Sequence, residues 1–324
     1  MAKEIKTIGV LTSGGDAPGM NAAVRAIVRA GISKGYRMMG IQRGYNGLIN
    51  GECYEMNVRS VSEIIHRGGT ILYTARCLEF QTKEGQAKGL ARCKELGIDA
   101  LVVIGGDGSF MGARALANQG IPCVGIPGTI DNDIACSEYT IGYDTAMNTA
   151  VEAIDKLRDT TQSHDRCSVV EVMGHHAGYI ALNVGIATGA LAVLLPERPF
   201  DFERDILQRM RQTQVTGKKH FIIIVSEGVT DAQTLANQIQ AATGVDSRAT
   251  VLGHIQRGGS PTVRDRVNAS LMGYHAVDLL DKGIYNRVVA LSGGKIVDYD
   301  VNVALSMHKY LDPMEIEVAQ AISI

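Results

Sequence analysis

Two carboxylates separated by a single residue stand out in the segment "PGTIDND" (127–133), where Asp131 and Asp133 flank an asparagine. Such a pair could hold a metal ion, act as a catalytic base, or serve as the polar part of a surface turn. Pro, Gly, Asn and Asp are the residues that turns favour, so the segment taken alone favours a plain turn. The surrounding chain must therefore decide its role.

The segments that follow the short apolar runs of the chain all contain glycine. The runs have the composition of strands buried on both faces. They are "TIGVLT" (7–12), "ALVVIG" (100–105), "PCVGIP" (122–127), "SVVEVM" (168–173), "FIIIVS" (221–226) and "ATVLGH" (249–254). The segments after them read "SGGDAPG", "GDGS", "GTIDND", "GHHAG", "EG" and "IQRGG". Because ligands of open parallel sheets bind beyond the carboxyl ends of the strands, these ends predict a ligand site.

The turn "GGDGS" (105–109) has the features of a phosphate site. Glycines let backbone N–H groups approach phosphate, a helix amino terminus adds partial positive charge, and Asp107 can hold Mg²⁺. A nucleoside triphosphate with its metal is the natural ligand. The plainer interpretation is a glycine turn in which Asp107 caps the helix. The chain contains no G-x-x-x-x-G-K-[ST] motif, and "GGDGSFMG" lacks the G-x-G-x-x-G spacing, which excludes a Walker or dinucleotide site.

A second glycine turn, "TSGGDAPGMN" (12–21), leads into a helix that carries Arg25 and Arg29. Residues four apart lie side by side on a helix, so the two arginines could clamp an anion or simply face solvent. The sequence leaves both interpretations open.

Strand-like runs alternate with segments of helical period. The predicted helices are 21–34, 86–96, 109–119, 145–159, 204–214, 231–242 and 264–282. This alternation predicts βαβ units and mainly parallel sheets. Because 324 residues exceed what one core usually supports, we expect an α/β fold with two doubly wound, Rossmann-like, three-layer αβα domains.

Composition limits the class of function. The chain is 45% hydrophobic and 20% charged with a net charge of -2, so neither nucleic acid nor an anionic membrane is an expected partner. No apolar run approaches the ~20 residues of a membrane helix. Six cysteines without a C-x-x-C pair indicate reduced thiols. The amino terminus shows no signal peptide, so a cytoplasmic location is expected.

Several motifs in register resemble bacterial ATP-dependent 6-phosphofructokinase from end to end. They are "TSGGDAPGMNA" (12–22), "GGDGS" (105–109), "PGTIDND" (127–133), "MG" (173–174) and "VLGHIQRGGSP" (251–261). The resemblance implies phosphorylation of fructose 6-phosphate to fructose 1,6-bisphosphate with Mg²⁺ and ATP. It also implies a homotetramer whose active sites are shared between subunits. The implied domains are 1–142 plus 256–307, the larger and ATP/Mg-binding one, and 143–255 plus 308–324, the fructose 6-phosphate domain.

The resemblance assigns roles to the carboxylates. Asp131 would take the proton from the 1-hydroxyl of the sugar, Asp133 would support the site, and Asp107 would hold Mg²⁺. This assignment makes physical sense, because the attacking oxygen must lose its proton as its bond to phosphorus forms. Thr129 would touch the transferred phosphoryl group. The implied ATP site consists of Gly15, Arg76, Cys77, Gly106, Asp107, Gly108 and Ser109.

The sugar phosphate would be held largely by arginine, whose planar fork suits phosphate oxygens. Arg166 and Arg248 would come from a neighbouring subunit, and His254 and Arg257 from the same subunit. The other substrate contacts implied by the resemblance are Thr129, Ile130, Asp131, Met173, Gly174, His175 and Glu227.

Two glycines indicate the phosphoryl donor. Relatives that use pyrophosphate carry aspartate where this chain has Gly108 and lysine where it has Gly128. An acid at the first position would repel the α-phosphate of ATP, and a lysine at the second would occupy its space. Both glycines therefore point to ATP.

One substrate contact departs from the family pattern. After "MG" the family usually carries arginine, but here His175 follows, next to His176. A neutral imidazole supplies less positive charge at pH 7, so weaker substrate binding or turnover is expected. The adjacent rings would point in different directions on one turn, which argues against a metal site.

The effector site of the family departs as well. It binds ADP or phosphoenolpyruvate at a subunit interface, and its basic character persists here. The matching residues are Arg25, Arg29, Arg158, Gly189, Lys218 and His220. A usual acidic residue is Leu191, however, and a usual lysine is Thr216. We therefore expect a blunted or absent response to ADP.

Two other functions are compatible with parts of the pattern. A catalytically idle sensor of phosphosugars or nucleotides would keep the arginines and lose the base, yet Asp131 and Asp107 are both present. A kinase with broader specificity, acting for example on sedoheptulose 7-phosphate or tagatose 6-phosphate, would keep every motif.

Overall fold

The structure is a computed structural model that describes residues 5–323. The chain forms two compact units, each built from separate segments. The larger contains the residues up to Ile130, Ile134–Thr145 and Arg257–Lys309. The smaller contains Asp131–Asp133, Ala146–Gln256 and the residues from Tyr310 onward.

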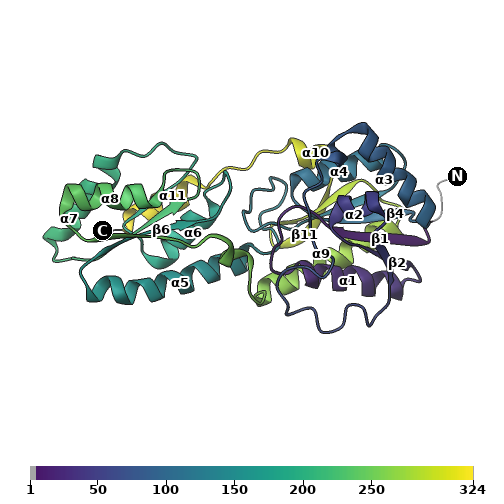
Figure 1. The fold of residues 1–324 in the computed structure, drawn as a ribbon, viewed down its shortest axis with the longest axis horizontal. Coiled ribbons are helices and arrows are strands. Elements are labelled where there is room, and N and C mark those ends of the chain that lie inside the picture. The colour runs from purple at the N-terminus through teal and green to yellow at the C-terminus, as the bar shows by residue number, and fades with distance from the viewer. Residues whose placement is uncertain (1–4, 324) are drawn as a thin grey trace. The chain divides into compact units, whose positions relative to one another are not determined.

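The larger unit is built on a seven-stranded sheet with the order β11-β10-β5-β4-β1-β2-β3 (Figure 1). All neighbouring strands pair in parallel except the two edge strands, β3 and β11. The strands are β1 (Thr7–Thr12), β2 (Arg37–Ile41), β3 (Cys53–Met56), β4 (Ala100–Gly105), β5 (Cys123–Pro127), β10 (Arg287–Ser292) and β11 (Lys295–Asp300).

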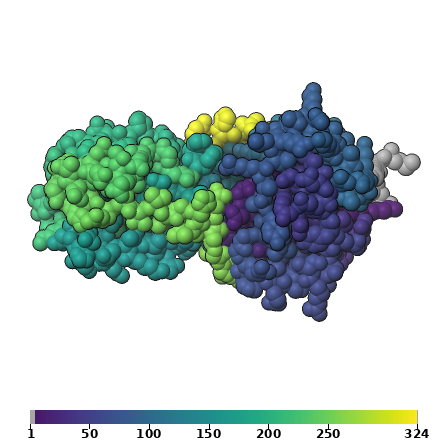
Figure 2. Space-filling view, viewed as in Figure 1, coloured from purple at the N-terminus to yellow at the C-terminus, as the bar shows by residue number. Residues whose placement is uncertain are grey.

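Helices cover both faces of this sheet. α1 (Met20–Ser33) and α9 (Val263–Asp281) pack side by side on one face. They approach closely at Gly273, where an added Cβ would lie 2.9 Å from the carbonyl oxygen of Ala23. The other face is covered by α2 (Gly44–Asn50), α3 (Lys83–Leu96) and α4 (Asp107–Ala117). α10 (Val301–Ser306) packs against α4 and β11. Figure 2 shows that the N-terminal part of the chain, coloured purple to blue, forms most of the visible surface of this unit.

The central strand β4 explains why both faces need helices. Leu101 and Val103 enter the apolar cluster beneath α2, α3 and α4, while Val102 and Ile104 point the other way and are equally inaccessible to solvent. Burying each such side chain contributes about 1.5–3 kcal/mol. A strand apolar at every position is therefore stable only between two helical layers.

The smaller unit has a four-stranded, wholly parallel sheet with the order β7-β8-β6-β9. An apolar cluster lies between this sheet and the helices α7 and α8. α6 packs on β8 and β7, and α11 lies against α6 and β7. The elements are α5 (Tyr143–Ser163), β6 (Cys167–Val172), α6 (Tyr179–Thr188), β7 (Ala192–Leu194), α7 (Gln208–Val215), β8 (Phe221–Ser226), α8 (Ala232–Thr243), β9 (Ser247–Val251) and α11 (Pro313–Ala321).

The predicted fold class, α/β with two doubly wound layers, is confirmed. One predicted strand is displaced: "ATVLGH" (249–254) was expected to be extended throughout, but β9 ends at Val251. Gly253 has a left-handed φ of 54° and begins a 3₁₀ turn, Gly253–Arg257, so the "GHIQR" residues lie on a turn.

All six cysteines are free thiols, as predicted. Burial raises the pKa of Cys53 and of Cys136 to about 11, so both are protonated at neutral pH. Within residues 5–323, no helix is long and apolar enough to cross a membrane.

Candidate active site

The larger sheet reverses its strand order between β1 and β4. From β1 the chain continues outward through β2 and β3, whereas β4, β5 and β10 extend the sheet in the opposite direction. The turns after β1 and β4 therefore flank the crevice where doubly wound folds bind ligands. These are the turns that contain Gly15 and the segment "GGDGS".

The two turns pack together so tightly that glycine is required. A Cβ on Gly105 would lie 2.4 Å from the Oγ of Ser109 and 2.4 Å from the carbonyl oxygen of Ser13. The backbone N–H of Ser13 donates to the carbonyl of Ile104 over 2.9 Å. Gly105 therefore serves close packing of the turns.

Gly108 has a different reason for being glycine. A Cβ there would meet no atom within 4 Å, and its φ is not positive. It lies in the first turn of α4, next to Asp107, and both residues are exposed. The first N–H groups of a helix have no partner within the helix and favour anions. The side chain missing at Gly108 leaves these groups accessible.

The loop that carries Arg76 and Cys77 is tied to the β1 turn. The hydroxyl of Thr74 donates to the carbonyl of Gly14 over 2.6 Å, and the hydroxyl of Thr12 donates to the carbonyl of Tyr73 over 2.8 Å. Arg76 is exposed, and Cys77 is half-buried against the cluster beneath α2, α3 and α4. The structure thus ties the loop that carries these two predicted residues, at Tyr73 and Thr74, to β1 and to the turn that contains Gly15.

Arg257 lies against the same turn. A Cβ on Gly15 would fall 2.0 Å from Nη1 of Arg257, so the guanidinium fills the space that any side chain at position 15 would need. Arg257 was predicted to bind the sugar phosphate together with His254. Arg257 belongs to the larger unit, whereas His254 belongs to the smaller one.

The turn after β5 is held from two sides. The N–H of Gly128 donates to the carbonyl of Gly105 over 3.0 Å, and the carbonyl of Thr129 accepts the hydroxyl of Thr140 over 2.6 Å. Ile130 is buried and ends this part of the larger unit. A Cβ on Gly128 would lie 2.9 Å from Cγ2 of Ile104, so no larger side chain fits without a shift.

The carboxylate pair lies in the segment Asp131–Asp133, which directly follows Ile130 and belongs to the smaller unit. Asp131 is 9% exposed, Asp133 is partly buried, and Asn132 between them has a left-handed φ of 54°. Asparagine tolerates this conformation better than most residues. The left-handed residue interrupts the extended chain between the two acids.

In the smaller unit, the turn after β6 is fastened by Glu227, which follows β8. Oε1 of Glu227 accepts the backbone N–H groups of Gly174 and His175 over 3.1 and 2.6 Å. A Cβ on Gly174 would lie 2.3 Å from the carbonyl oxygen of Ala177, so the turn needs glycine. Met173, 7% exposed, precedes it. His254 follows the neighbouring strand β9 and is exposed.

The two adjacent histidines do not diverge as expected. Their ring centroids are 4.0 Å apart, with an angle of 44° between the planes. The reason is the left-handed φ of 56° at His175, which turns the chain back on itself. In the described part of the chain, however, neither belongs to a group of three metal-ligating side chains.

Glu171 lies on β6 two residues before Met173 and was not among the predicted site residues. Burial, aided by the nearby Glu227 carboxylate, raises the pKa of Glu171. A charged residue within the apolar run "SVVEVM" was the available signal. Tyr179, which follows the same turn, also has its pKa raised by burial, to about 12, and so keeps its proton at neutral pH.

Arg166 and Arg248 lie at the other end of the same sheet. Arg166 immediately precedes β6, and Arg248 is the second residue of β9. Both pair with Asp246: Nε of Arg166 lies 2.6 Å and an Nη of Arg248 3.1 Å from its carboxylate. The hydrogen bond from Arg166 lowers the pKa of Asp246 most. The whole length of β6 lies between these arginines and Met173. Within a single chain, the arginines therefore cannot contact the same ligand as Met173 and Glu227.

The predicted effector residues also divide between the units. Arg25 and Arg29 lie on α1 of the larger unit. In the smaller unit, a guanidinium N–H of Arg158 donates to the carbonyl of Thr188, next to Gly189, the left-handed residue that ends α6. Burial and the charge of Arg158 lower the pKa of Lys218, so these cations are close. Leu191, in contrast, is buried in the apolar cluster.

The residues present fit a magnesium ion at Asp107. Mg²⁺ usually keeps several waters and binds through one or two carboxylates together with substrate phosphates. An exposed aspartate in the first turn of α4, beside accessible N–H groups, supplies that kind of site. Residues 5–323 contain no group of three or more His, Cys, Asp or Glu side chains that could hold an ion without a substrate.

The profile of the family described as phosphofructokinase matches residues 7–280. Proteins named ATP-dependent 6-phosphofructokinase from Clostridium botulinum (strain Hall) and Clostridium novyi (strain NT) are each 54% identical to this chain over 319 residues. These matches cover 98% of this chain and 100% of each relative.

Among solved structures, phosphofructokinase from Saccharomyces cerevisiae matches 98% of this chain with a TM-score of 0.88 and 34% identity. The chain spans 46% of the length of that yeast chain. A pyrophosphate-dependent phosphofructokinase from Marinobacter aquaeolei, 22% identical, has a TM-score of 0.83 over 95% of this chain and 86% of its own. At that identity the likeness concerns the fold alone.

Proposed function

The chain belongs to the phosphofructokinase family, and we propose that it transfers the γ-phosphoryl group of ATP to the 1-hydroxyl of fructose 6-phosphate, giving fructose 1,6-bisphosphate. The observation that carries this proposal is the glycine turn 105–109, which opens α4 at the strand-order reversal of the larger sheet. The names of full-length relatives with 54% identity support the donor and the acceptor.

The proposed chemistry rests on two carboxylates. Asp131 accepts the proton of the sugar 1-hydroxyl as that oxygen attacks phosphorus, and Asp133 supports it. Asp107 would hold Mg²⁺, which neutralises charge that develops on the phosphate oxygens. Thr129 and the N–H groups at the start of α4 would orient the transferred phosphoryl group. Positioning and electrostatic stabilisation by these groups carry most of the catalysis in phosphoryl transfer.

The glycines support ATP as the donor in two ways. Gly108 has open space around it, so its lack of a side chain is explained by access to the turn rather than by packing. Gly128 has Ile104 and Met20 within 2.9 and 3.1 Å of an added Cβ, so a lysine would have to displace core side chains. We therefore propose that pyrophosphate is a poor donor.

A coupled assay of the purified protein tests this function. ATP should support turnover of fructose 6-phosphate and pyrophosphate should not. Asp131→Asn keeps the size of the side chain and removes the base, so kcat should fall by about 100- to 10,000-fold. A wild type that binds both substrates without turnover would contradict the proposal, and retained activity in the variant would contradict the role of Asp131.

We also propose that the active sites are shared within a homotetramer. The support is the placement of Arg166 and Arg248 at the amino-terminal end of the smaller sheet, while Met173 and Glu227 lie at its carboxyl-terminal end. Arginines so placed can reach a sugar phosphate only on a neighbouring subunit.

Mixed oligomers test this arrangement. Asp131→Asn and Arg248→Ala are each expected to be nearly inactive alone. When the two chains are coexpressed, some sites receive Asp131 from one subunit and Arg248 from another. Random assembly should restore about a quarter of the wild-type activity, since half of the subunits supply each group. No recovery in hybrids verified by mass would contradict shared sites.

The predicted weak response to ADP remains a proposal. Leu191 is 1% exposed within an apolar cluster and cannot hold the metal of a nucleotide, and Thr216 supplies no charge. An activation curve at limiting fructose 6-phosphate should stay flat with ADP, and clear activation would contradict the proposal. Leu191→Glu is the variant expected to introduce a response if it folds. The cytoplasmic location stays a prediction.

A further inference from the structure

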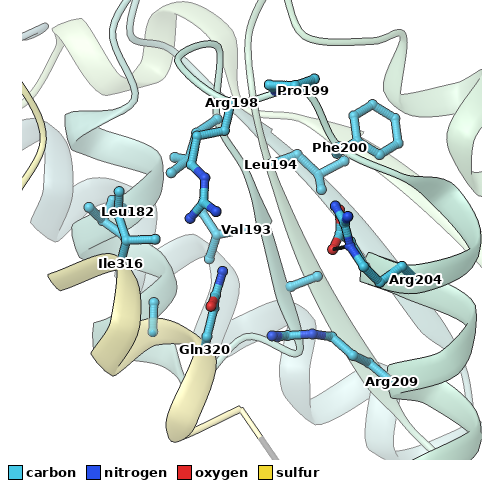
Figure 3. A pocket seen from close by; sticks show the side chains of 14 residues that line it. Leu182, Val193, Leu194, Arg198, Pro199, Phe200, Arg204, Arg209, Ile316 and Gln320 are labelled. Atoms are coloured by element: carbon cyan, nitrogen blue, oxygen red, sulfur yellow. Dashed lines mark hydrogen bonds and ion pairs between the residues drawn. The ribbon is translucent and has the colours of Figure 1, made fainter. Parts of the chain in front are cut away.

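A pocket of about 610 Å³, open to solvent, lies along the free edge of β7 in the smaller unit (Figure 3). Its walls come from α6, β7, the loop after β7, the start of α7 and α11. Every lining residue belongs to the smaller unit. The predicted substrate and effector residues do not line it.

Nine of the fourteen lining residues are apolar, and the other five are polar or charged. Leu182 and Ile316 lie on one side, Phe200 on the other, and Val193 and Leu194 of the edge strand between them. Apolar side chains combined with a few placed polar groups are the usual lining of a small-molecule site.

The polar groups of the pocket carry excess positive charge, with three arginines and one aspartate. Arg204 is neutralised by Asp205, to which its Nε and an Nη donate over 2.8 Å each. Arg209 donates to the carbonyl of Leu191 and to the hydroxyl of Ser323, over 3.0 and 2.8 Å, and neither acceptor carries a charge.

Arg198 has the clearest capacity for a ligand. Its side chain extends into the pocket toward Gln320, between Leu182 and Val193 (Figure 3). Among residues 5–323, no carboxylate forms an ion pair with Arg198, which is exposed. A guanidinium beside an apolar wall is suited to bind a carboxylate in a bidentate manner.

The edge strand adds backbone groups. β7 pairs only with β8, and the N–H of Leu191 donates to Ile222 on that side. In a parallel pair, alternate residues direct both of their backbone groups to one neighbour, so Ala192 and Leu194 direct theirs away from β8, toward the pocket.

We propose that this pocket binds a small organic carboxylate with an apolar body, its acidic group on Arg198 and its body against Leu182, Phe200 and Ile316. An inorganic anion would leave the apolar wall uncovered. An extended peptide would find only three residues of edge strand. The inference goes beyond the proposed kinase function and does not depend on it.

A single-tryptophan reporter tests the binding. The chain has no tryptophan, so Phe200→Trp places the only indole at the pocket and keeps an aromatic wall. Titration of the full-length variant with octanoate should shift the emission and saturate. The uncharged 1-octanol should bind at least about 10-fold more weakly, because it cannot pair with a guanidinium. Calorimetry of the unmodified chain with octanoate checks that the reporter did not create the site.

The charge is tested in the same background. Arg198→Ala should weaken octanoate binding by about 10-fold or more, and Arg198→Lys should weaken it less. The matched control is Arg211→Ala, which removes an exposed arginine of α7 that pairs with Glu203 outside the pocket. It should change binding less than about 2-fold, as expected for an exposed ion pair.

Three results would overturn the proposal. One is no saturable binding of octanoate to the unmodified chain. Another is equal binding of octanoate and 1-octanol, or no effect of Arg198→Ala, since either removes the role of the charge. The third is that Arg198→Ala changes the molar mass of the protein in solution, both with and without octanoate. That result would mean that a second copy of the chain covers the pocket.

Discussion

The carboxyl ends of the two sheets are built in opposite ways. In the larger unit the turns after β1 and β4 present mainly glycine backbone, together with two carboxylates, Asp16 and Asp107. In the smaller unit the corresponding turns present the side chains of Met173, His175, Glu227 and His254. Under the proposed function, one layout recognises the phosphates of ATP through N–H groups, while the other distinguishes one sugar from another through side chains. Substitutions should therefore separate the two substrates cleanly.

The largest effect on this separation is expected from Gly108→Asp. The position is exposed with open space, so the fold should tolerate the side chain. The added charge would repel the phosphates of ATP and lower kcat/KM for ATP by about 100-fold, equivalent to about 2.8 kcal/mol. Steady-state kinetics with each substrate varied is the measurement. Asn118→Asp, at the exposed carboxyl-terminal end of α4, is the control for added charge. A comparable rise in KM for fructose 6-phosphate would contradict the assignment of ATP recognition to the turns of the larger unit.

Glu227→Ala should have the next largest effect, in the opposite unit. The variant loses the acceptor of the Gly174 and His175 N–H groups, which costs about 1–3 kcal/mol of folding free energy. KM for fructose 6-phosphate should rise by about 10-fold, while KM for ATP stays within about 2-fold. Urea unfolding and steady-state kinetics measure the two consequences. Glu227→Gln keeps one carbonyl oxygen and should retain much of the stability. If it binds the sugar as well as wild type does, the carboxylate charge has no role in recognition.

His175→Arg should produce a smaller change of the opposite sign. Arginine is always charged and can bind phosphate in a bidentate manner. KM for fructose 6-phosphate should therefore fall by about 3- to 10-fold, equivalent to about 0.7–1.4 kcal/mol. The left-handed backbone of His175 adds some strain for arginine, so His175→Gln, without a charge, is the matched control. A lower KM in both variants would exclude charge as the cause.

The smallest expected effects are opposite trends of stability with pH. Burial raises the pKa of Asp265 in the larger unit, so its contribution to stability is present at low pH and lost as pH rises through its folded pKa. The hydrogen bond from Arg166 lowers the pKa of Asp246 in the smaller unit, so its contribution is lost as pH falls.

These trends are compared by measuring melting temperatures between pH 4 and 7 for wild type, Asp265→Asn and Asp246→Asn. Steady-state kinetics at each pH check that each protein is folded. On acidification, wild type should gain stability relative to Asp265→Asn and lose it relative to Asp246→Asn. Parallel curves for all three proteins would show that neither carboxylate titrates differently on folding.

Much of the fold follows from hydrophobic pattern alone. Strands such as β4 and β8 are buried at every position and almost wholly apolar, and they were predicted within a residue. The helix α6 was missed because it is buried nearly all round and therefore shows no amphipathic period. β7 was missed because it has only three residues. The hydrophobic period does not reveal a helix buried like α6, and a strand as short as β7 has too few residues to show a pattern.

The candidate site was predictable where backbone chemistry dictates residue type. Gly105 and Gly174 are required by the close approach of neighbouring atoms, so glycine at these positions was a usable signal of tightly packed turns. The association of Arg257 with Gly15 was not predictable, since it depends on where the "GHIQR" turn leads the chain. The same limit applies to the close, tilted contact between the rings of His175 and His176, which follows from a left-handed residue.

The packing of α1 against α9 has a consequence for synthesis on the ribosome. α1 is among the first elements to emerge, yet the helix that meets it at Gly273 and the strand β10 that pairs with β5 are made near the end. The sheet of the smaller unit, from β6 to β9, is continuous in the chain and is complete before then. The face of α1 that packs against α9 must therefore stay uncovered until α9 has been made.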